Sequence, residues 1–130
     1  MTHAIKNATL LVLNYDDAIT FYTQKLNFIL VEDVQLGDGK RWVTIQAKNQ
    51  PDFGLVLSLA SSELQKATVG KQAGDGVAFF MQTSDTKRDY TLFSKNGVVF
   101  IQEPTEQPYG IVAIFKDLYG NKWDLIQPTA

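Results

Sequence analysis

The order of predicted elements repeats once along the chain, and this repeat constrains the fold more than any single motif. Each half of the 130 residues is predicted as a strand, a helix and three further strands. The two halves share little sequence identity, so the repeat is one of pattern. A helix that crosses over a sheet covers one face and leaves the other free to line a pocket. We therefore predict one α+β domain, with βαβββ modules over residues 1–66 and 74–130 that form a concave, cup-like mixed sheet with helices on its outer face.

In the first module, the apolar run over residues 8–13 predicts a buried strand, and Asn14 or Asp16 is the candidate cap of the helix that follows. Helical spacing puts an apolar stripe on one face of that helix, with Ala18 widening it. The stripe consists of Tyr15, Ile19, Tyr22 and Leu26. Three strands are predicted after the helix, over residues 28–36, 40–47 and 53–60.

The connection to the second module is predicted over residues 61–76, where Ser61 or Ser62 caps a short helix and glycines follow. A strand and a helix come next, the helix with Ser84 near its start and Gly97 just past its end. The predicted ranges are 76–83 for the strand, 84–97 for the helix, and 98–104, 109–117 and 122–128 for the last three strands.

Composition excludes several classes of function. The chain has 12 lysines and arginines against 14 aspartates and glutamates, without a basic run, so we expect no nucleic-acid partner. It has no cysteine, which excludes disulfides, thiolate metal sites and a cysteine nucleophile. The N-terminal sequence lacks the layout of a signal peptide, and no apolar run approaches the roughly 20 residues of a membrane span. We therefore expect a cytoplasmic protein with no membrane partner.

Motifs along the whole chain resemble the vicinal oxygen chelate superfamily, which includes glyoxalase I, bleomycin resistance proteins and extradiol dioxygenases. LVLNYDDAITFYTQKLNF resembles the opening strand and helix of that superfamily, with Asn14 and Asn27 in place of its usual aspartate and glycine. FKDLYGNKWDLIQ resembles its closing hairpin. The segments RWVTIQ, GKQAGDGVAFF and QPYGIVAIF are similar to a bacterial glyoxalase-like subgroup.

The resemblance implies four positions that hold a divalent ion in the metal enzymes of the superfamily. In this sequence they fall on Asn7, Leu55, Gly76 and Asp124, within about one residue. Leucine and glycine offer no donor atom, and the one histidine, His3, lies near the terminus. A shift of one residue would bring in Asp75 and allow a site of oxygen ligands alone. We predict no metal and no cofactor.

Asp124 lies among apolar residues of a predicted strand and has more than one interpretation. Strand alternation sends Lys122, Asp124 and Ile126 to one face, and Trp123 and Leu125 to the other, under a helix. The structural interpretation is an acid that is solvated or paired at the mouth of the cup. The functional interpretation is an acceptor for a polar or cationic ligand, or a catalytic general base, because an apolar cup disfavours the charged form.

Five further residues are candidate ligand contacts, each with a structural alternative. Arginine on a strand can hold a carboxylate or an aromatic ring, or it can form an ordinary salt bridge. Glutamines can donate to a ligand or lie exposed, and a tyrosine beside a proline turn can reach the ligand or simply pack. These residues are Arg41, Trp42, Gln46, Gln102 and Tyr109. We expect the phenylalanines at 79, 80, 100 and 115 in the core, with one or two lining the pocket.

Two functions from different classes follow. The first is a metal-free protein of the glyoxalase/bleomycin resistance type that holds a small organic compound in the concave sheet. The second is a lyase, isomerase or dioxygenase of the same superfamily, either metal-dependent or using Asp124 as general base. The incomplete ligand set favours the first. The resemblance also implies a homodimer.

Overall fold

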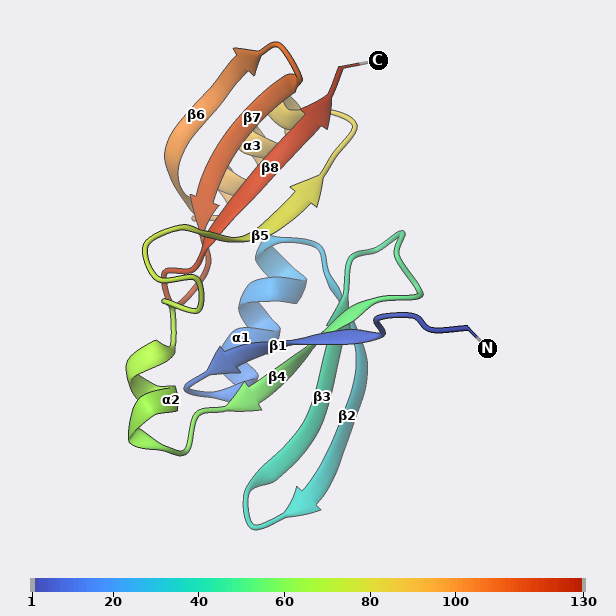
Figure 1. Ribbon diagram of the computed structural model, residues 1–130, viewed down its shortest axis with the longest axis vertical. Helices are drawn as coiled ribbons and strands as arrows, with labels where there is room; N and C mark the ends of the chain where they lie inside the picture. Colours follow the sequence, from blue (N-terminus) through green and yellow to red (C-terminus); the bar gives the residue numbers. More distant parts are fainter. Residues whose placement is uncertain (1, 130) are drawn as a thin grey trace. The chain divides into compact units, whose positions relative to one another are not determined.

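The computed structural model describes residues 2–129 (Figure 1). Along the chain, these residues divide into two compact units, the first ending at Val69 and the second beginning at Gly70. We call them the N-terminal unit and the C-terminal unit. Each unit contains one four-stranded sheet of mixed parallel and antiparallel strands, with strand, helix and three strands in sequence order. The predicted α+β class and the two βαβββ modules are confirmed.

The N-terminal unit has the sheet order β1-β4-β3-β2, in which β1 pairs with β4 in parallel and the other pairs are antiparallel. Its elements are β1 (Asn7–Val12), α1 (Tyr15–Thr20), the π-helix η1 (Phe21–Lys25), β2 (Ile29–Gly37), β3 (Lys40–Gln46), β4 (Gly54–Leu59) and α2 (Glu63–Thr68).

The helix of this unit begins and packs as its sequence predicts. The side chain of Asn14 caps α1 by accepting from the backbone N–H of Asp17 at 2.9 Å. The predicted stripe faces the sheet, with Tyr15, Tyr22 and Leu26 buried together with Ala18. After Thr20 the helix changes from an α-helix to the wider π-helix η1. Nothing in the sequence indicated this change. Ser62 caps α2 and forms a reciprocal capping box with Gln65.

The C-terminal unit repeats the arrangement with the order β5-β8-β7-β6, where β5 and β8 are parallel. Its elements are β5 (Val77–Gln82), α3 (Thr86–Lys95), β6 (Val99–Gln107), β7 (Gly110–Lys116) and β8 (Lys122–Pro128). Helix α3 packs on β6, β7 and β8, so within this unit one face of the sheet is covered by a helix and the other is not. We call the uncovered face of each sheet its open face.

Aromatic rings form the core between α3 and its sheet. Phe115 and Trp123 are stacked with ring centroids 5.8 Å apart, and Phe93 of α3 meets Phe115 edge-on. Phe79 lies over Trp123 at 4.4 Å, and Leu125 is fully buried beside them. The predicted alternation of β8 is therefore confirmed, with Trp123 and Leu125 under the helix.

In this unit, β6 and α3 depart most from their predicted ranges. Strand β6 does not end at Pro104 but continues to Gln107, because an edge strand tolerates a residue that cannot donate to the ladder. The pairing of β6 with β7 is irregular between Gln102 and Thr105, the stretch that contains Pro104. Helix α3 begins at Thr86 with Asp85 as its cap, since the Asp85 carboxylate accepts from the N–H of Arg88 at 3.0 Å.

The described part of the chain, residues 2–129, has no helix that is long and apolar enough to cross a membrane.

Candidate functional site

A cross-strand row on the open face of the C-terminal unit brings Asp124 together with one of the other predicted site residues. Asp124 on β8 is paired with Ile114 on β7, and Ile114 with Gln102 on β6. On the other side, Asp124 is paired with Phe80 on β5. Paired residues of neighbouring strands point to the same face of a sheet, so all four side chains share the open face. We call this set the Asp124 row.

The carboxylate of Asp124 is partly buried and has no hydrogen bond or ion pair within the C-terminal unit. Burial raises the pKa of the Asp124 carboxyl above its ordinary value, because the surrounding apolar groups disfavour the charged form. A cation or a hydrogen-bond donor paired with the Asp124 carboxylate would lower its pKa instead. Asp124 is therefore a carboxylate whose acceptor capacity its own unit leaves unused.

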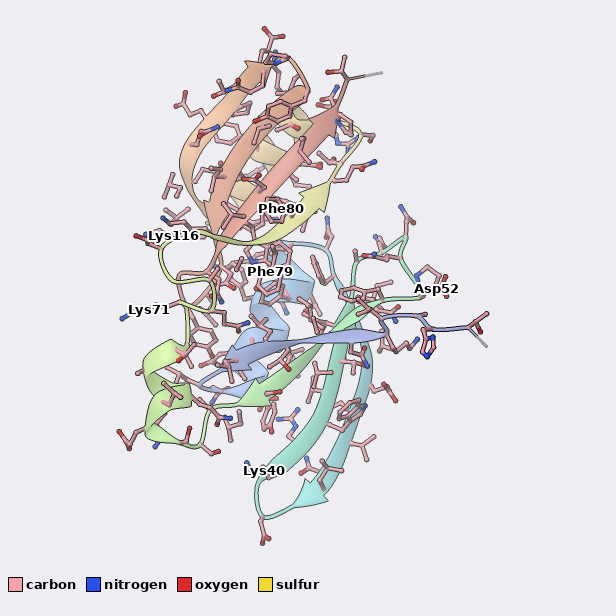
Figure 2. The ribbon with its side chains drawn as sticks, viewed as in Figure 1. Lys40, Asp52, Lys71, Phe79, Phe80 and Lys116 are labelled. Carbon is pink, nitrogen blue, oxygen red and sulfur yellow. The ribbon has the colours of Figure 1, made fainter. Side chains whose placement is uncertain are left out.

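Phe80 supplies an exposed aromatic surface next to this acid. Phe80, labelled in Figure 2, is 72% exposed. Phe79, the preceding residue of β5, lies against the buried Trp123, with ring centroids 4.4 Å apart. Phe79 therefore contacts the core as expected, whereas Phe80 does not, and a ligand contact by Phe80 stays a prediction. An exposed phenylalanine costs solvation free energy, and a partially buried acid does too. Their adjacency marks the row as a candidate binding surface.

The turn before β8 is held by a buried acid that the sequence analysis did not single out. Asp117, 6% exposed, accepts from the backbone N–H groups of Tyr119, Gly120 and Asn121 at 2.9–3.0 Å through one carboxylate oxygen. Its other oxygen accepts from the side-chain amide of Asn121 at 3.0 Å and from the indole N–H of Trp123 at 3.4 Å. This network fixes the start of β8 and hence the direction of Asp124. The D-x-x-G-N pattern of residues 117–121 was the sequence signal that could have identified Asp117 as the acid that holds this turn.

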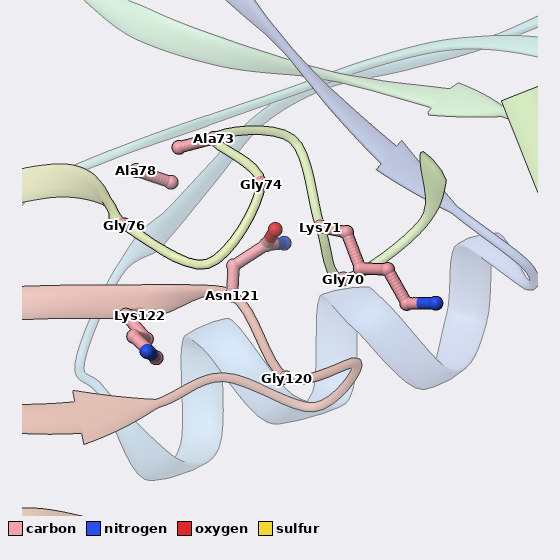
Figure 3. A pocket seen from close by; sticks show the side chains of 9 residues that line it. All are labelled: Gly70, Lys71, Ala73, Gly74, Gly76, Ala78, Gly120, Asn121 and Lys122. Atoms are coloured by element: carbon pink, nitrogen blue, oxygen red, sulfur yellow. The ribbon is translucent and has the colours of Figure 1, made fainter. Parts of the chain in front are cut away.

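A small hollow lies beside this turn, where the loop after Gly70 meets the start of β8 (Figure 3). Its volume is about 20 Å³, room for roughly one water molecule. The side chain of Asn121 reaches towards the loop and accepts from the N–H of Gln72 at 3.3 Å. Gly70 has φ +78 and lies so close to the carbonyl of Tyr119 that an added Cβ would clash with it. The hollow is a packing feature and is too small for an organic ligand.

The open face of the N-terminal unit carries the equivalent row, formed by Thr9, Val56, Thr44 and Glu32. Glu32 is held on this face by two donors. Its Oε1 atom accepts from the indole N–H of Trp42 and from the hydroxyl of Thr44, both at 3.1 Å. The sequence analysis named Trp42 but missed Glu32. An acid predicted opposite Thr44 across the hairpin, and diagonal to Trp42, was the signal that could have found it.

Arg41 lies on the opposite face of β3 from Trp42 and is engaged in a salt-bridge network. It donates to both carboxylate oxygens of Asp33 at 3.0 and 2.6 Å and to Asp16 at 3.0 Å, and its guanidinium lies 5.0 Å from the centre of the Tyr15 ring. These hydrogen bonds raise the pKa of Arg41 further and lower the pKa of Asp33. The salt-bridge alternative describes these contacts, and a ligand contact by Arg41 stays a prediction.

The remaining candidates have weaker polar contacts with the protein. Gln46, on the same face of β3 as Trp42, donates to the carbonyl of Pro51 at 3.1 Å. Gln102 donates to the carbonyl of Val112 at 3.4 Å from within the Asp124 row. Tyr109 is exposed in the turn between β6 and β7. Ligand contacts by Gln46, Gln102 and Tyr109 stay predictions.

The residues at the implied metal positions fit a metal poorly. The side chain of Leu55 is buried on the helix side of β4, so the open-face residue there is Val56, one position later, which also lacks a donor atom. Gly76 has no side chain. Within residues 2–129, no three histidine, cysteine, aspartate or glutamate side chains gather closely enough to hold an ion. Asn7 and Asp124 alone would leave most of a coordination shell without protein ligands.

Comparison of the sequence with protein families gives one match over nearly the whole chain. A model described as Glyoxalase/Bleomycin resistance protein/Dioxygenase superfamily matches residues 4–125. An uncharacterized protein of Shewanella frigidimarina is 44% identical over 128 residues, which are 98% of this chain and 95% of that protein. The uncharacterized protein YurT of Bacillus subtilis is 33% identical over 126 residues, 92% of this chain and 94% of YurT.

Solved structures resemble the chain over its full length. The crystal structure of UcmS2 has a TM-score of 0.87 at 30% identity and covers 98% of this chain and 99% of its own. TnmS3, an antibiotic binding protein from Streptomyces sp. CB03234, has a TM-score of 0.80 at 26% identity, with 99% and 98% covered. A superfamily member from Sphaerobacter thermophilus has a TM-score of 0.78 at 25% identity, with 96% and 97% covered.

Proposed function

Because the chain belongs to the glyoxalase/bleomycin resistance protein/dioxygenase superfamily, we propose that it is a metal-free protein that binds a small organic compound on the open face of its sheets. The compound has a flat apolar part and a hydrogen-bond donor or a positive charge. The observation that carries this proposal is the Asp124 row, where an unpartnered, partly buried carboxylate lies next to an exposed phenylalanine.

The chemistry of the row sets the class of ligand. An aromatic ring of a ligand would stack on Phe80, which would remove apolar surface of both partners from water. A donor of the ligand would then reach Asp124, whose carboxylate lacks a partner in its own unit. Gln102 at the far end of the row adds an amide that can donate or accept. An anionic ligand would be repelled by the same arrangement.

One relative of known structure supports binding. TnmS3 is an antibiotic binding protein, and its match covers 99% of this chain. An antibiotic that combines a flat ring with a hydrogen-bond donor would have the chemistry proposed for a ligand of the Asp124 row. The ligand of this chain is accordingly proposed to be a small aromatic compound of that general kind.

We further propose that two copies of the chain associate. Strand β2 is an edge strand that leaves a series of apolar side chains exposed, and such a surface is normally covered in a stable protein. A second copy would also help to enclose a ligand that the open face of one sheet leaves exposed. The exposed side chains of β2 are Ile29, Leu30, Val31, Val34 and Leu36.

One observation favours a second candidate, in which Asp124 is the general base of an enzyme. The raised pKa of its carboxyl makes it a better proton acceptor than an ordinary aspartate. The substrate would then be a carbon acid or hydroxyl compound bound on the same row. Mass spectrometry of the bound compound after incubation separates the candidates, because a binding protein returns the compound unchanged. A new product formed by the wild type and not by Asp124→Asn would establish the enzyme.

The binding proposal is tested by a thermal-shift screen of aromatic natural products and amine-bearing aromatic fragments against the metal-free chain. We expect some compounds to raise the melting temperature by several degrees, an effect that Phe80→Ala and Asp124→Asn reduce. Glu103→Gln is the matched control, since Glu103 is an exposed acid next to Gln102 in the same unit. Stabilisation that requires added manganese, iron, nickel or zinc, with about one ion retained per chain by elemental analysis, would contradict the proposal.

A further inference from the structure

Glu32 on the open face of the N-terminal unit has the geometry of a ligand acceptor. Both of its side-chain hydrogen bonds use a single oxygen, Oε1, which accepts from Trp42 and Thr44 at 3.1 Å. The other oxygen, Oε2, has no hydrogen bond within residues 2–129, and Glu32 makes no salt bridge there. The carboxylate is therefore fixed in direction while half of its acceptor capacity is free.

The same hydrogen bond fixes the ring of Trp42. An indole whose N–H donates to Glu32 cannot rotate without breaking that bond, so its ring is held in place on the open face. The side chain is 38% exposed, and its cross-strand partner Val34 is exposed as well. A fixed aromatic surface and a fixed carboxylate thus lie side by side, so little conformational freedom remains to be lost when a ligand binds.

These features differ from those of an ordinary surface ion pair. In the same hairpin, Asp33 points to the helix side, where Arg41 donates to both of its oxygens. Glu32, one residue earlier, has neutral donors on one oxygen and no cation on the other. Lys40 lies on the same side of β3 as Trp42 but does not form a salt bridge with Glu32. The charge of Glu32 is therefore left for a cation from outside the unit.

We propose that Glu32 and Trp42 form a binding site for a protonated amine attached to a flat aromatic ring. The ring lies against the indole of Trp42 and the exposed side chain of Val34, and the ammonium group donates to Oε2 of Glu32. The indole contributes further, since an aromatic face attracts a nearby cation. Thr44 acts as a positioning residue, because it contacts Oε1 and not the ligand. The inference rests on the proposed function and assigns a ligand class to the N-terminal unit.

The test uses three probes that share one ring: 2-naphthylmethylamine, the neutral 2-naphthylmethanol and the anion 2-naphthylacetate. The full-length chain, labelled with ¹⁵N in tryptophan, gives one indole signal from Trp42 and one from Trp123. We expect the amine to move the Trp42 signal saturably and to bind about tenfold more tightly than the acid, the effect of one charge-assisted contact. The buried Trp123 signal serves as the internal reference.

Glu32→Gln keeps an acceptor for Trp42 and Thr44 and removes the charge, so the variant is expected to fold. It should bind the amine no more tightly than the alcohol. Asp38→Asn is the matched control, since it removes one charge from the same hairpin at a residue with φ 54, which asparagine also adopts. Equal binding of the amine by wild type and Glu32→Gln, or a Trp42 signal that does not move, would overturn the inference.

A second readout separates this inference from the proposed function. The Ile114 methyl group lies in the Asp124 row of the other unit. Probes that move the Ile114 signal but leave Trp42 unchanged would overturn the Glu32 site and leave the proposed function standing. Failure of all three probes to move either signal would count against both.

Discussion

Phe80 lies directly beside Asp124 on the neighbouring parallel strand, and both side chains share the open face of the C-terminal unit. This relationship combines two features that a protein normally avoids, an exposed ring and a carboxylate without a partner in its unit. The next residue on each strand shows the opposite behaviour, since Met81 and Leu125 are paired and Leu125 is fully buried. The strands are therefore well packed on one face, and the unfavourable pair is confined to the face that is proposed to bind the ligand.

Replacing Asp124 by asparagine should stabilise the folded chain at neutral pH. Since burial raises the pKa of the folded carboxyl, ionisation costs more in the folded state than in the unfolded state. This cost is absent below the ordinary pKa, grows as the pH rises through the folded pKa, and then stays constant. We expect Asp124→Asn to melt a few degrees above wild type at pH 7 and at the same temperature near pH 3. A lower melting temperature at pH 7 would mean that the carboxylate has a stabilising partner.

Removing the acid that holds the β7–β8 turn should be strongly destabilising. Asp117→Ala leaves the N–H groups of Tyr119, Gly120 and Asn121 without their acceptor in a buried setting. The expected loss in the free energy of unfolding is about 3 kcal/mol, measured by urea denaturation. Glu103→Ala, at an exposed acid, should change it by less than about 0.5 kcal/mol. Equal losses in the two variants would contradict the role given to Asp117.

Arg41 should contribute to stability through its fork-shaped contact with Asp33. Arg41→Lys keeps the charge but cannot donate to both oxygens of Asp33 and to Asp16 at once, and we expect a loss of about 1 kcal/mol. The pKa of Asp33 is lowered, so the stabilisation is present above its ordinary pKa and disappears as the pH falls through the lowered value. Urea denaturation should show the full loss at pH 7 and a loss that shrinks as the pH falls below the ordinary pKa of Asp33.

Much of the fold could be predicted from the sequence, because its local signals agree with one another. Asn14 and Ser62 are capping residues followed by helical patterns, and both cap helices. The alternation of Asp124 and Trp123 on β8 is a direct consequence of strand geometry. The extension of β6 past Pro104 was not predictable, since it depends on β6 being an edge strand. The wide turn of η1 had no sequence signal.

The site was predictable only in part, since strand register decides which side chains meet. The sequence analysis named Gln102 and Asp124 separately, and only the pairing through Ile114 places them in one row. Arg41 and Trp42 were named together, yet adjacent strand residues point to opposite faces. Leu55 and Val56 are likewise adjacent on β4, and only Val56 points to the open face. Glu32 was missed because its partners are ten and twelve residues away.

The chain should be a homodimer in solution. Multi-angle light scattering at micromolar concentration is expected to give about twice the 14.5 kDa mass of one chain. The physical reason is the exposed apolar surface of β2, which association would remove from water. A mass near that of one chain over the whole concentration range would contradict the proposed association, without bearing on the Asp124 row.

The central claim is that a small aromatic compound with a donor group binds on the Asp124 row, and the most direct measurement locates that binding. The chain labelled at its isoleucine methyl groups would be titrated with 2-naphthylmethylamine and followed by NMR. The account predicts saturable shifts at Ile114 and Ile126 on the open face, with about tenfold weaker binding to Asp124→Asn and none of this loss in Glu103→Gln. Shifts confined to Ile45 and Ile111 on the helix-facing sides, or equal affinity for wild type and Asp124→Asn, would contradict it.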